Sequence, residues 1–432
     1  MILAGVAIRN ARSAAASSSG ATELSAEESL QELRGLAESA GGRVVEITLQ
    51  QRASVDSATV IGAGKVTELG ELVRFHEADL VVFDRELSPT QLRNLEKALD
   101  CRVIDRTQLI LDIFASRART REGQLQVELA QLNYLLPRLT GRGVEMSRLG
   151  GGIGTRGPGE TKLETDRRRI HHRIQKLERD LNSVRAGRSV QRRQRQSVPL
   201  ATVALVGYTN AGKSTLFNRL TGAGVVADSR MFATLDPTVR HVTLPSKRRV
   251  LLSDTVGFIR KLPTALVKAF RATLEEVTEA ALLLHVVDVS SPHATAYVAQ
   301  VNRVLEEIGS AATPSILVLN KTDLAPDGVS DGDTTGRRMI AEGHLPEKTV
   351  ALAVSARTGD GLPQLLGAID AGIDLDPTEK TRFRIPLSDG AALSVLHDRA
   401  RVLKKGYREN YCDVVADAPA SVRRELAGYI RR

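Results

Sequence analysis

The feature that most constrains this chain is the eight-residue loop at 207–214, G-Y-T-N-A-G-K-S. The apolar run 203–206 precedes it and is typical of a buried strand. The loop matches G-x-x-x-x-G-K-[ST], in which backbone N–H groups and a helix N-terminus face a phosphate chain. Lys213 is expected to contact the β and γ phosphates, and Ser214 to bind Mg²⁺. The pattern therefore predicts a phosphate-binding loop, with a glycine-rich surface turn as the alternative for so short a motif.

Two further motifs follow that are typical of nucleotide-dependent switches. Residues 232–238, F-A-T-L-D-P-T, lie where a first switch is expected. A threonine hydroxyl there completes the Mg²⁺ shell while the γ-phosphate is present, and we assign this role to Thr234, with Thr238 as the rival. Residues 254–257, D-T-V-G, fit a second switch in which Asp254 holds the metal through water and the Gly257 N–H senses the γ-phosphate.

The next two motifs concern the base. In N-K-T-D at 320–323, the carboxylate of Asp323 accepts two N–H bonds from guanine, a pair that adenine does not offer. S-A-R at 355–357 supports the base from behind. Five elements in this order predict a guanine-nucleotide site with GTP as substrate and Mg²⁺ as cofactor. The nucleotide-binding residues are predicted to be Gly207, Tyr208, Thr209, Asn210, Ala211, Gly212, Lys213, Ser214, Phe232, Ala233, Thr234, Leu235, Asp236, Asp254, Thr255, Val256, Gly257, Asn320, Lys321, Thr322, Asp323, Ser355, Ala356 and Arg357.

Within this set we assign catalytic roles to Lys213, Thr234 and Gly257, and metal ligation to Ser214 and Thr234. One expected group is missing. Many switch GTPases carry a glutamine after the D-x-x-G glycine that orients the attacking water, and this chain has Phe258 there. Intrinsic hydrolysis is therefore expected to be slow, with the missing stabilisation supplied by a partner.

The positive charge of the chain is concentrated in one segment. Residues 138–195 hold 16 Arg/Lys and 6 Asp/Glu, a balance of +10, whereas the whole chain carries +9. Such a segment beside a nucleotide domain predicts a polyanionic partner, and a solvated helix face is the alternative. Aromatic residues make up only 3% of the chain, which favours phosphate and shape contacts with nucleic acid over base stacking.

The same segment predicts a helical hairpin with an unusual tip. Leu125, Leu129, Leu132 and Leu136 recur at helical spacing, and a similar apolar series runs through 163–184. Between them, residues 141–160 contain eight glycines, too many for a helix and too long a run for an ordinary loop. We interpret this run as an exposed tip of the hairpin in which Arg142, Arg148 and Arg156 bind phosphate groups. The alternative is a plain flexible linker.

The remaining patterns complete the fold class. Strand-like runs at 44–48, 80–83 and 102–104 alternate with helical patterns and predict an N-terminal parallel α/β domain. The continuous apolar runs 284–289 and 316–319 predict a doubly wound sheet. In the last part, 382–385 and 410–415 are predicted strands, and 391–403 and 420–430 predicted helices. The predicted domains are an α/β domain at 1–117, the hairpin and basic linker at 118–197, a P-loop GTPase domain at 198–375 and a small α/β domain at 376–432.

At this point the sequence resembles the HflX family of ribosome-associated GTPases. The resemblance rests on G-A-G-K at 62–65, D-R-T at 105–107 with L-D-I-F at 111–114, the run 150–166 ending E-T-K-L-E-T-D, D-T-V-G-F-I-R at 254–260 and A-F-R-A-T-L-E-E at 269–276. It implies binding to the 50S subunit, ribosome-stimulated GTP hydrolysis and separation of 70S ribosomes under stress. It also implies that the glycine-rich tip reaches 23S rRNA.

Two functional hypotheses follow. In the first, the chain is a GTPase that couples its nucleotide state to ribosome splitting; in the second, it is a nucleotide-gated rRNA-binding assembly or hibernation factor with little dependence on hydrolysis. We expect a cytoplasmic monomer with no membrane span, because no apolar run approaches the roughly 20 residues that a membrane helix needs. The Ser/Ala-rich segment 9–22 also fits a transit peptide, but we favour a first strand followed by a loop.

Overall fold

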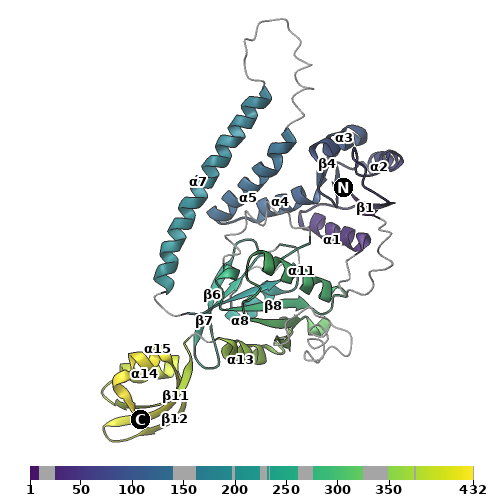
Figure 1. Cartoon of the computed structure of the whole chain (residues 1–432). Helices are drawn as coiled ribbons and strands as arrows, with labels where there is room; N and C mark the ends of the chain where they lie inside the picture. Colours follow the sequence, from purple (N-terminus) through teal and green to yellow (C-terminus); the bar gives the residue numbers. More distant parts are fainter. Residues whose placement is uncertain are drawn as a thin grey trace. The chain divides into compact units, whose positions relative to one another are not determined.

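The computed structural model describes residues 1–8, 25–139, 162–196, 200–223, 231–232, 234–260, 276–324, 349–373 and 376–431 (Figure 1). Ala233, the glycine-rich run 150–159 and the segment 9–22 lie outside the described residues. The chain divides into two compact units. The first unit comprises 1–187, 228–236 and 259–272, and the second comprises 188–227, 237–258 and 273–432.

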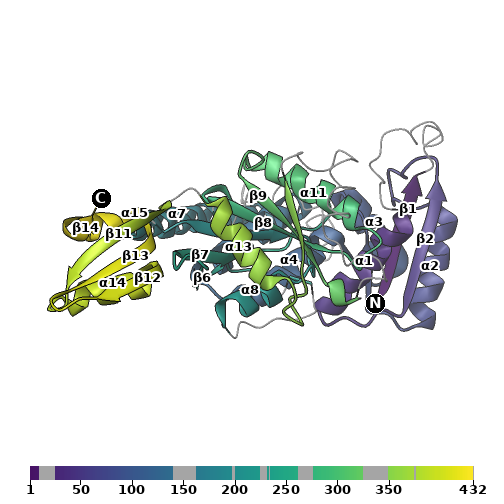
Figure 2. The ribbon, with the colours of Figure 1, turned by 90° about the horizontal axis from the view of Figure 1, so that it is seen from below.

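The first unit begins with a four-stranded parallel sheet of order β2-β1-β3-β4. Figure 2 shows β1 and β2 running side by side, with β1 in the interior of the sheet. Its strands are β1 (Ile2–Ile8), β2 (Glu46–Arg52), β3 (Leu80–Phe83) and β4 (Arg102–Asp105). Its helices are α1 (Ala26–Ser39), α2 (Ala63–Phe75), α3 (Pro89–Leu99) and α4 (Arg106–Arg117). The predicted N-terminal parallel α/β architecture is therefore confirmed.

Local sequence explains where two of these helices begin. The Ser25 hydroxyl accepts a hydrogen bond from the Glu28 N–H at 3.2 Å, and the Glu28 carboxylate accepts one from the Ser25 N–H at 2.7 Å. Ser88 and Gln91 repeat this reciprocal arrangement at the start of α3. Each capping box satisfies two N–H groups that the first helical turn leaves without partners.

Two further helices pack on each other, within the first unit, through the predicted leucine series. They are α5 (Arg121–Leu135), which continues into a short 3₁₀ turn, and the 35-residue α7 (Lys162–Gln196). Leu125 of α5 is buried against Leu177 and Leu181 of α7. Beside this contact, the Arg173 guanidinium donates two hydrogen bonds to the Glu128 carboxylate, at 2.6 and 2.7 Å. The long helix is therefore attached to α5 by an apolar seam with a bidentate ion pair at its edge.

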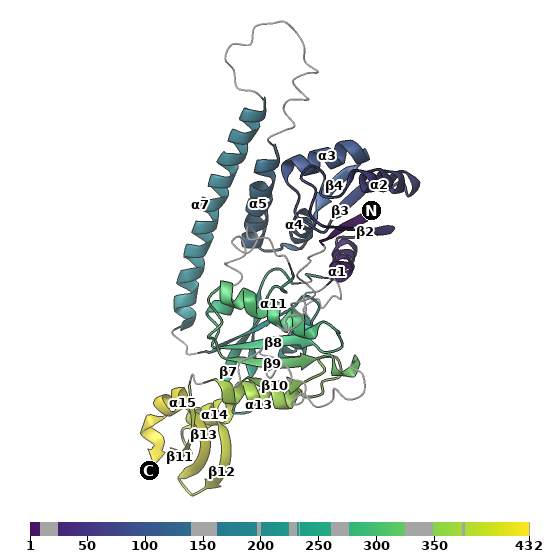
Figure 3. The same cartoon turned by 45° about the vertical axis from the view of Figure 1, so that its right-hand side comes forward.

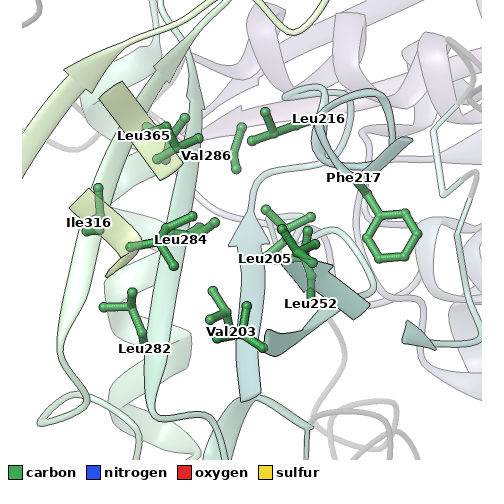
Figure 4. Close-up of a cluster of buried hydrophobic side chains, with 14 of the residues drawn as sticks. Val203, Leu205, Leu216, Phe217, Leu252, Leu282, Leu284, Val286, Ile316 and Leu365 are labelled. Atoms are coloured by element: carbon green, nitrogen blue, oxygen red, sulfur yellow. The ribbon is translucent and has the colours of Figure 1, made fainter. Parts of the chain in front are cut away.

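The second unit contains a six-stranded sheet of order β10-β9-β8-β5-β7-β6, in which β6 alone runs antiparallel to its neighbour. Its strands are β5 (Thr202–Gly207), β6 (Thr238–Thr243), β7 (Arg249–Asp254), β8 (Leu282–Asp288), β9 (Ser315–Asn320) and β10 (Val350–Ala353). The helices are α8 (Lys213–Thr221), α11 (Ala294–Glu307) and α13 (Leu362–Gly372). Leu205 and Leu284 lie in a buried core that also takes in Phe217 of α8 and Leu365 of α13 (Figure 4). Burial of both sheet faces explains why these strands read as continuous apolar runs.

The second unit ends in a smaller antiparallel sheet of order β12-β13-β11-β14 (Figure 3). Its elements are β11 (Thr378–Pro386), α14 (Gly390–Arg399), β12 (Arg401–Tyr407), β13 (Tyr411–Pro419), α15 (Ala420–Glu425) and β14 (Ile430–Arg431). Two sequence predictions were wrong here. The predicted helices 391–403 and 420–430 end early, at Arg399 and Glu425, because the residues that follow enter the sheet as β12 and, after a 3₁₀ turn, β14. Among the described residues, no helix is both long and apolar enough to span a bilayer.

Candidate nucleotide site

The phosphate-binding loop of the second unit connects β5 directly to α8. At two positions of this loop the backbone conformation and the neighbouring atoms allow only glycine. Gly207 has φ 149°, and a Cβ there would lie 2.2 Å from the carbonyl oxygen of Val286. Gly212 has φ 93°, and its Cβ would lie 2.3 Å from the side-chain amide nitrogen of Asn320. Left-handed backbone and close neighbours thus restrict both positions to glycine.

Lys213 lies at the first position of α8 with only 5% of its surface exposed. Its ammonium donates hydrogen bonds to the carbonyl oxygens of Gly207 at 3.0 Å and Tyr208 at 2.8 Å, so it lies within the curl of the loop. Burial lowers the pKa of Lys213 to about 8, and the nearby carboxylate of Asp254 opposes that shift. The phosphates of a bound nucleotide would supply negative charge that stabilises this buried ammonium.

This arrangement predicts that nucleotide binding weakens as the pH rises above about 8. The free protein loses the Lys213 proton near pH 8, whereas the phosphates favour the charged ammonium, so the complex takes up a proton above that pH. We expect little change between pH 7 and 7.5, and up to about tenfold loss of GTP affinity per pH unit above 8. Calorimetry at pH 8.5 in two buffers of different ionisation enthalpy measures the proton uptake. Release of protons at pH 8.5, or none exchanged, would contradict the prediction.

Ser214 and Asp254 form the part of the site suited to a metal ion. The Ser214 hydroxyl donates to the Asp254 carboxylate at 2.7 Å, and Asp254 is fully buried at the end of β7. A hydroxyl and a carboxylate in contact are the hard oxygen ligands that Mg²⁺ prefers, so these residues fit the predicted ion. No group of three or more His, Cys, Asp or Glu suited to a metal occurs among the residues described. Mg²⁺ here would take most of its ligands from nucleotide phosphate and water.

The second switch is joined to the phosphate loop by backbone hydrogen bonds. The Thr209 N–H donates to the Phe258 carbonyl at 2.8 Å, and the Phe258 N–H donates to the Gly207 carbonyl at 3.1 Å. A Cβ on Gly257 would lie 2.9 Å from the Cα of Thr209 and 3.0 Å from the ammonium of Lys213. The Phe258 ring is 3% exposed and lies in an apolar cluster. The position expected to orient water therefore holds a core side chain.

The base-recognition motifs meet the phosphate loop through Asn320. Its side-chain N–H donates to the Ala211 carbonyl at 2.8 Å, and its side-chain oxygen accepts from the Ala356 N–H at 3.0 Å. The Ser355 hydroxyl donates to the Asp323 carboxylate at 2.6 Å, and Arg357 lies 3.0 Å from its second oxygen. The Asp323 carboxylate is thus held in one orientation. The three segments that the sequence assigned to phosphate and base lie together at the carboxyl ends of β5, β9 and β10.

Three contributors to this site were missed by the sequence analysis. Asp288, at the end of β8, binds the Lys321 ammonium at 2.6 Å and so fixes the middle of the base motif. Tyr297 of α11 stacks on Tyr208 with 3.9 Å between ring centroids. His285 of β8 is paired with Val206, and burial followed by the charge of Lys213 lowers its pKa to about 4. A polar residue inside an apolar strand was the available signal for His285, but Tyr297 had none.

The first-switch segment belongs to the first unit. The Phe232 ring packs edge-on against Phe114 of α4, with centroids 4.6 Å apart. The Met231 N–H donates to the Ser39 hydroxyl at 2.8 Å. Leu235 is buried and Thr234 is half-buried in this segment. These contacts tie a nucleotide-switch motif to helices of the N-terminal domain.

Asp236 makes the most specific of the contacts in this segment. Its carboxylate accepts hydrogen bonds from the N–H groups of Arg119 and Thr120, both at 2.8 Å, and from the Thr120 hydroxyl at 2.5 Å. These donors lie at the start of α5, where N–H groups lack helical partners and negative charge is favourable. The Thr120 hydroxyl in turn accepts from the Gly123 N–H at 3.0 Å. Thr120 is therefore the N-cap of α5, and Asp236 anchors this residue by accepting hydrogen bonds from its N–H and its hydroxyl.

Replacing Asp236 by alanine is expected to lower the free energy of unfolding by about 1–3 kcal/mol, because the N–H groups of Arg119 and Thr120 lose their charged acceptor. Asp236→Asn retains one acceptor oxygen and should lose less. Urea denaturation followed by circular dichroism measures both variants. Equal stability of Asp236→Ala and the unchanged protein would show that the hydrogen bonds of Asp236 to Arg119 and Thr120 do not stabilise the fold.

A doubly wound sheet with this loop at its switch point, and with the predicted base-reading carboxylate of Asp323 held by Ser355, is typical of a P-loop GTP-binding protein. Three family models match the chain: "GTP-binding GTPase N-terminal" over 27–115, "GTP-binding GTPase Middle Region" over 117–195 and "50S ribosome-binding GTPase" over 202–321. The GTPase HflX of Caldanaerobacter subterraneus subsp. tengcongensis is 46% identical over 94% of this chain and 90% of its own. This chain belongs to the HflX family of GTPases, and it hydrolyses GTP.

Other relatives show how far this similarity extends. GTPase HflX of Escherichia coli is 44% identical over 89% of this chain and 88% of its own. GTPase HflX of Alkalihalophilus pseudofirmus reaches 56% identity over 70% of this chain and 71% of its own. Among solved structures, a GTP-binding protein of Sulfolobus solfataricus in complex with GDP is 25% identical, with a TM-score of 0.43, over 86% of this chain and 98% of that one.

Proposed function

We propose that this GTPase binds the large (50S) ribosomal subunit and its 23S rRNA, and that it splits 70S ribosomes or prevents their association during recovery from stress or stalling. It acts as a cytoplasmic monomer whose GTP hydrolysis is stimulated by the ribosome. The observation that carries this proposal is the presence in one chain of a predicted guanine-nucleotide site and the strongly basic α7. The description of the model that matches 202–321, "50S ribosome-binding GTPase", supports the same partner.

The described part of α7 supports an RNA-facing role. Arg167, Lys176 and Arg179 are exposed. By helical periodicity Lys176 and Arg179 lie on the side of α7 away from the buried Leu177 and Leu181. Arg173 is held by its bidentate pair with Glu128. Phosphate groups of RNA are the partner that a cationic helix face of this kind fits best.

The nucleotide state controls binding to the ribosome through the residues of the nucleotide site. Lys213 holds the β and γ phosphates, and the Gly257 N–H contacts the γ-phosphate while it is present. When bound, Mg²⁺ supplies positive charge that offsets the charge developing on the transferred phosphoryl group, and Ser214 and Thr234 are its proposed ligands. Thr234 lies two residues before Asp236, so a change in the first switch reaches the start of α5. The GTP form binds the ribosome, and hydrolysis permits release.

The direct test measures GTP turnover with and without purified 50S subunits, together with sedimentation of 70S particles incubated with the protein. We expect stimulation by 50S at low salt and GTP-dependent conversion of 70S into subunits. A GTP turnover rate that does not change when 50S subunits are added would contradict the proposed function. Arg156→Ala, in the glycine-rich run, should weaken 50S binding and leave GTP affinity intact.

A second candidate is favoured by Phe258. With a buried ring at the water-orienting position, nucleotide binding alone could perform the work, as in an assembly or hibernation factor gated by GTP. A non-hydrolysable GTP analogue separates the two. Complete 70S splitting with the analogue supports the second candidate, and splitting only with GTP supports the first.

A further inference from the structure

The C-terminal sheet of the second unit has one covered face and one open face. Phe383, Ile385, Val414 and Ala416 point to the side where Leu396 of α14 and Val422 of α15 complete a buried core. Figure 3 shows both helices on that side of the sheet. None of the three matching family models extends to these residues, since the last ends at 321.

Strand register identifies the side chains on the open face. Directly opposed residues of an antiparallel pair share a face, and successive residues alternate. Arg382 and Lys404 both lie opposite Val415, and Arg431 lies opposite Arg382. One row across the sheet therefore carries three cations and a valine. Among the paired residues of the described strands, the cations on the open face are Lys380, Arg382, Arg384, Arg401, Lys404 and Arg431.

Two carboxylates share this face, so six cations outnumber them. Asp413 accepts a hydrogen bond from the Arg384 guanidinium at 3.0 Å, which lowers the Asp413 pKa, and Asp417 lies opposite Lys380 and Arg401. The two acids offset two of the six charges. The face keeps an excess of positive charge at neutral pH.

The contrast with the helix-covered side shows that this excess is specific to the open face. Toward the helices, Arg399 pairs with Glu425 at 2.6 Å, and Arg423 pairs with Glu379. On the open face no ion pair to a described residue is formed by Lys380, Arg401, Lys404 or Arg431. Like charges placed directly opposite each other, as Arg382 and Arg431 are, weaken a sheet. A bound polyanion would relieve that repulsion.

We propose that the open face of the C-terminal sheet is a second RNA-binding surface, which holds the phosphate backbone. Lys380, Arg382 and Arg384 alternate along β11, so their charges are spaced about 7 Å apart along one strand. The face carries a single aromatic ring, Tyr411, over which the Arg384 guanidinium lies at 4.4 Å. One ring supports little base stacking, so recognition through phosphates, without sequence preference, fits this surface.

The test compares two neighbouring residues of β12 that face opposite ways. Lys404 lies on the open face, whereas Lys405 points to the other side and lies 5.6 Å from the Tyr407 ring. Both are exposed. Full-length protein carrying Arg382→Glu and Lys404→Glu is compared with Lys405→Glu, with fluorescence anisotropy of a labelled 20-nucleotide poly(U) RNA as the readout across a salt series. Thermal unfolding checks that each variant is folded.

We expect the double variant to bind poly(U) at least about tenfold more weakly at low salt. Its slope of log affinity against log salt should be shallower by about 1.4, for two lost phosphate contacts. Lys405→Glu should remain within about twofold of the unchanged protein. Equal affinity and slope in the double variant and Lys405→Glu would overturn the proposal. If that result came with loss of 50S binding in the double variant alone, the occupant would be an acidic protein, which also overturns the RNA assignment.

This inference does not require the function proposed above. Affinity for poly(U) is measured without ribosomes, so absence of 50S-stimulated GTP turnover would remove that function and leave the open-face result standing. Conversely, the double variant could bind poly(U) as the unchanged protein does while 50S subunits still stimulate its GTP turnover. That result would contradict only the proposal that the open face binds RNA.

Discussion

Replacing Lys213 by alanine is expected to reduce GTP affinity by roughly 30- to 4,000-fold. The side chain is buried within the phosphate loop, and its ammonium already lies 2.8–3.0 Å from two loop carbonyls, so it meets a polyphosphate without reorganisation. Truncating one partner of a buried charge pair costs about 2–5 kcal/mol, which sets the expected range. Alanine also leaves the Gly207 and Tyr208 carbonyl oxygens without their donor.

Isothermal titration calorimetry with GTP and GDP measures this loss. Lys247→Ala is the matched control, because Lys247 is an exposed lysine in the turn between β6 and β7 of the same domain. The control should bind both nucleotides as the unchanged protein does. A Lys213→Ala variant that binds GTP within threefold of the control would show that this ammonium does not hold the phosphates.

Replacing Asp323 by asparagine is expected to remove the preference for guanine. Two hydrogen bonds from guanine to a carboxylate are worth about 3–6 kcal/mol together, so GTP affinity should fall by about 10²- to 10⁴-fold. Asparagine presents an N–H₂ group to a base edge that is itself a donor. ATP affinity, which does not depend on this carboxylate, should change little.

Ser355→Ala provides a graded comparison for Asp323→Asn. It removes the 2.6 Å hydrogen bond that orients the carboxylate but keeps the carboxylate itself. We expect a loss of about 2- to 13-fold in GTP affinity, the effect of one ordinary hydrogen bond. Competition between GTP and ATP for a fluorescent guanine nucleotide gives both numbers. Parallel losses for GTP and ATP in Asp323→Asn would mean that the variant damages the loop rather than base recognition.

Contacts within the first unit connect the first switch to a helix of the hairpin. Asp236 binds Thr120, the N-cap of α5, and α5 packs on α7 through Leu125, Leu177 and Leu181. The three hydrogen bonds of Asp236 converge on one carboxylate. This geometry offers a short route by which a movement of the first switch changes the start of α5.

The segments that could be predicted from sequence share one property: their signal is local. The phosphate loop and the base motif depend on residues within a few positions of each other, and periodic leucines predicted the helices α5 and α7. The strands β12 and β14 could not be found in this way. Their backbone groups are satisfied only by pairing with β13 and β11, so a helical pattern in the sequence was overridden by distant partners.

The sequence by itself determined the class of this protein, because the residues predicted to contact phosphate and guanine occur in contiguous motifs, and such motifs can be recognised without knowledge of the fold. Only the tertiary structure decided which surroundings each motif has. It placed the Asp236 carboxylate on the start of α5, it put a buried Phe258 beside the phosphate loop, and it gathered the cations of β11, β12 and β14 on one open face. Such juxtapositions depend on packing and strand register between segments far apart in the chain, and no local pattern encodes them.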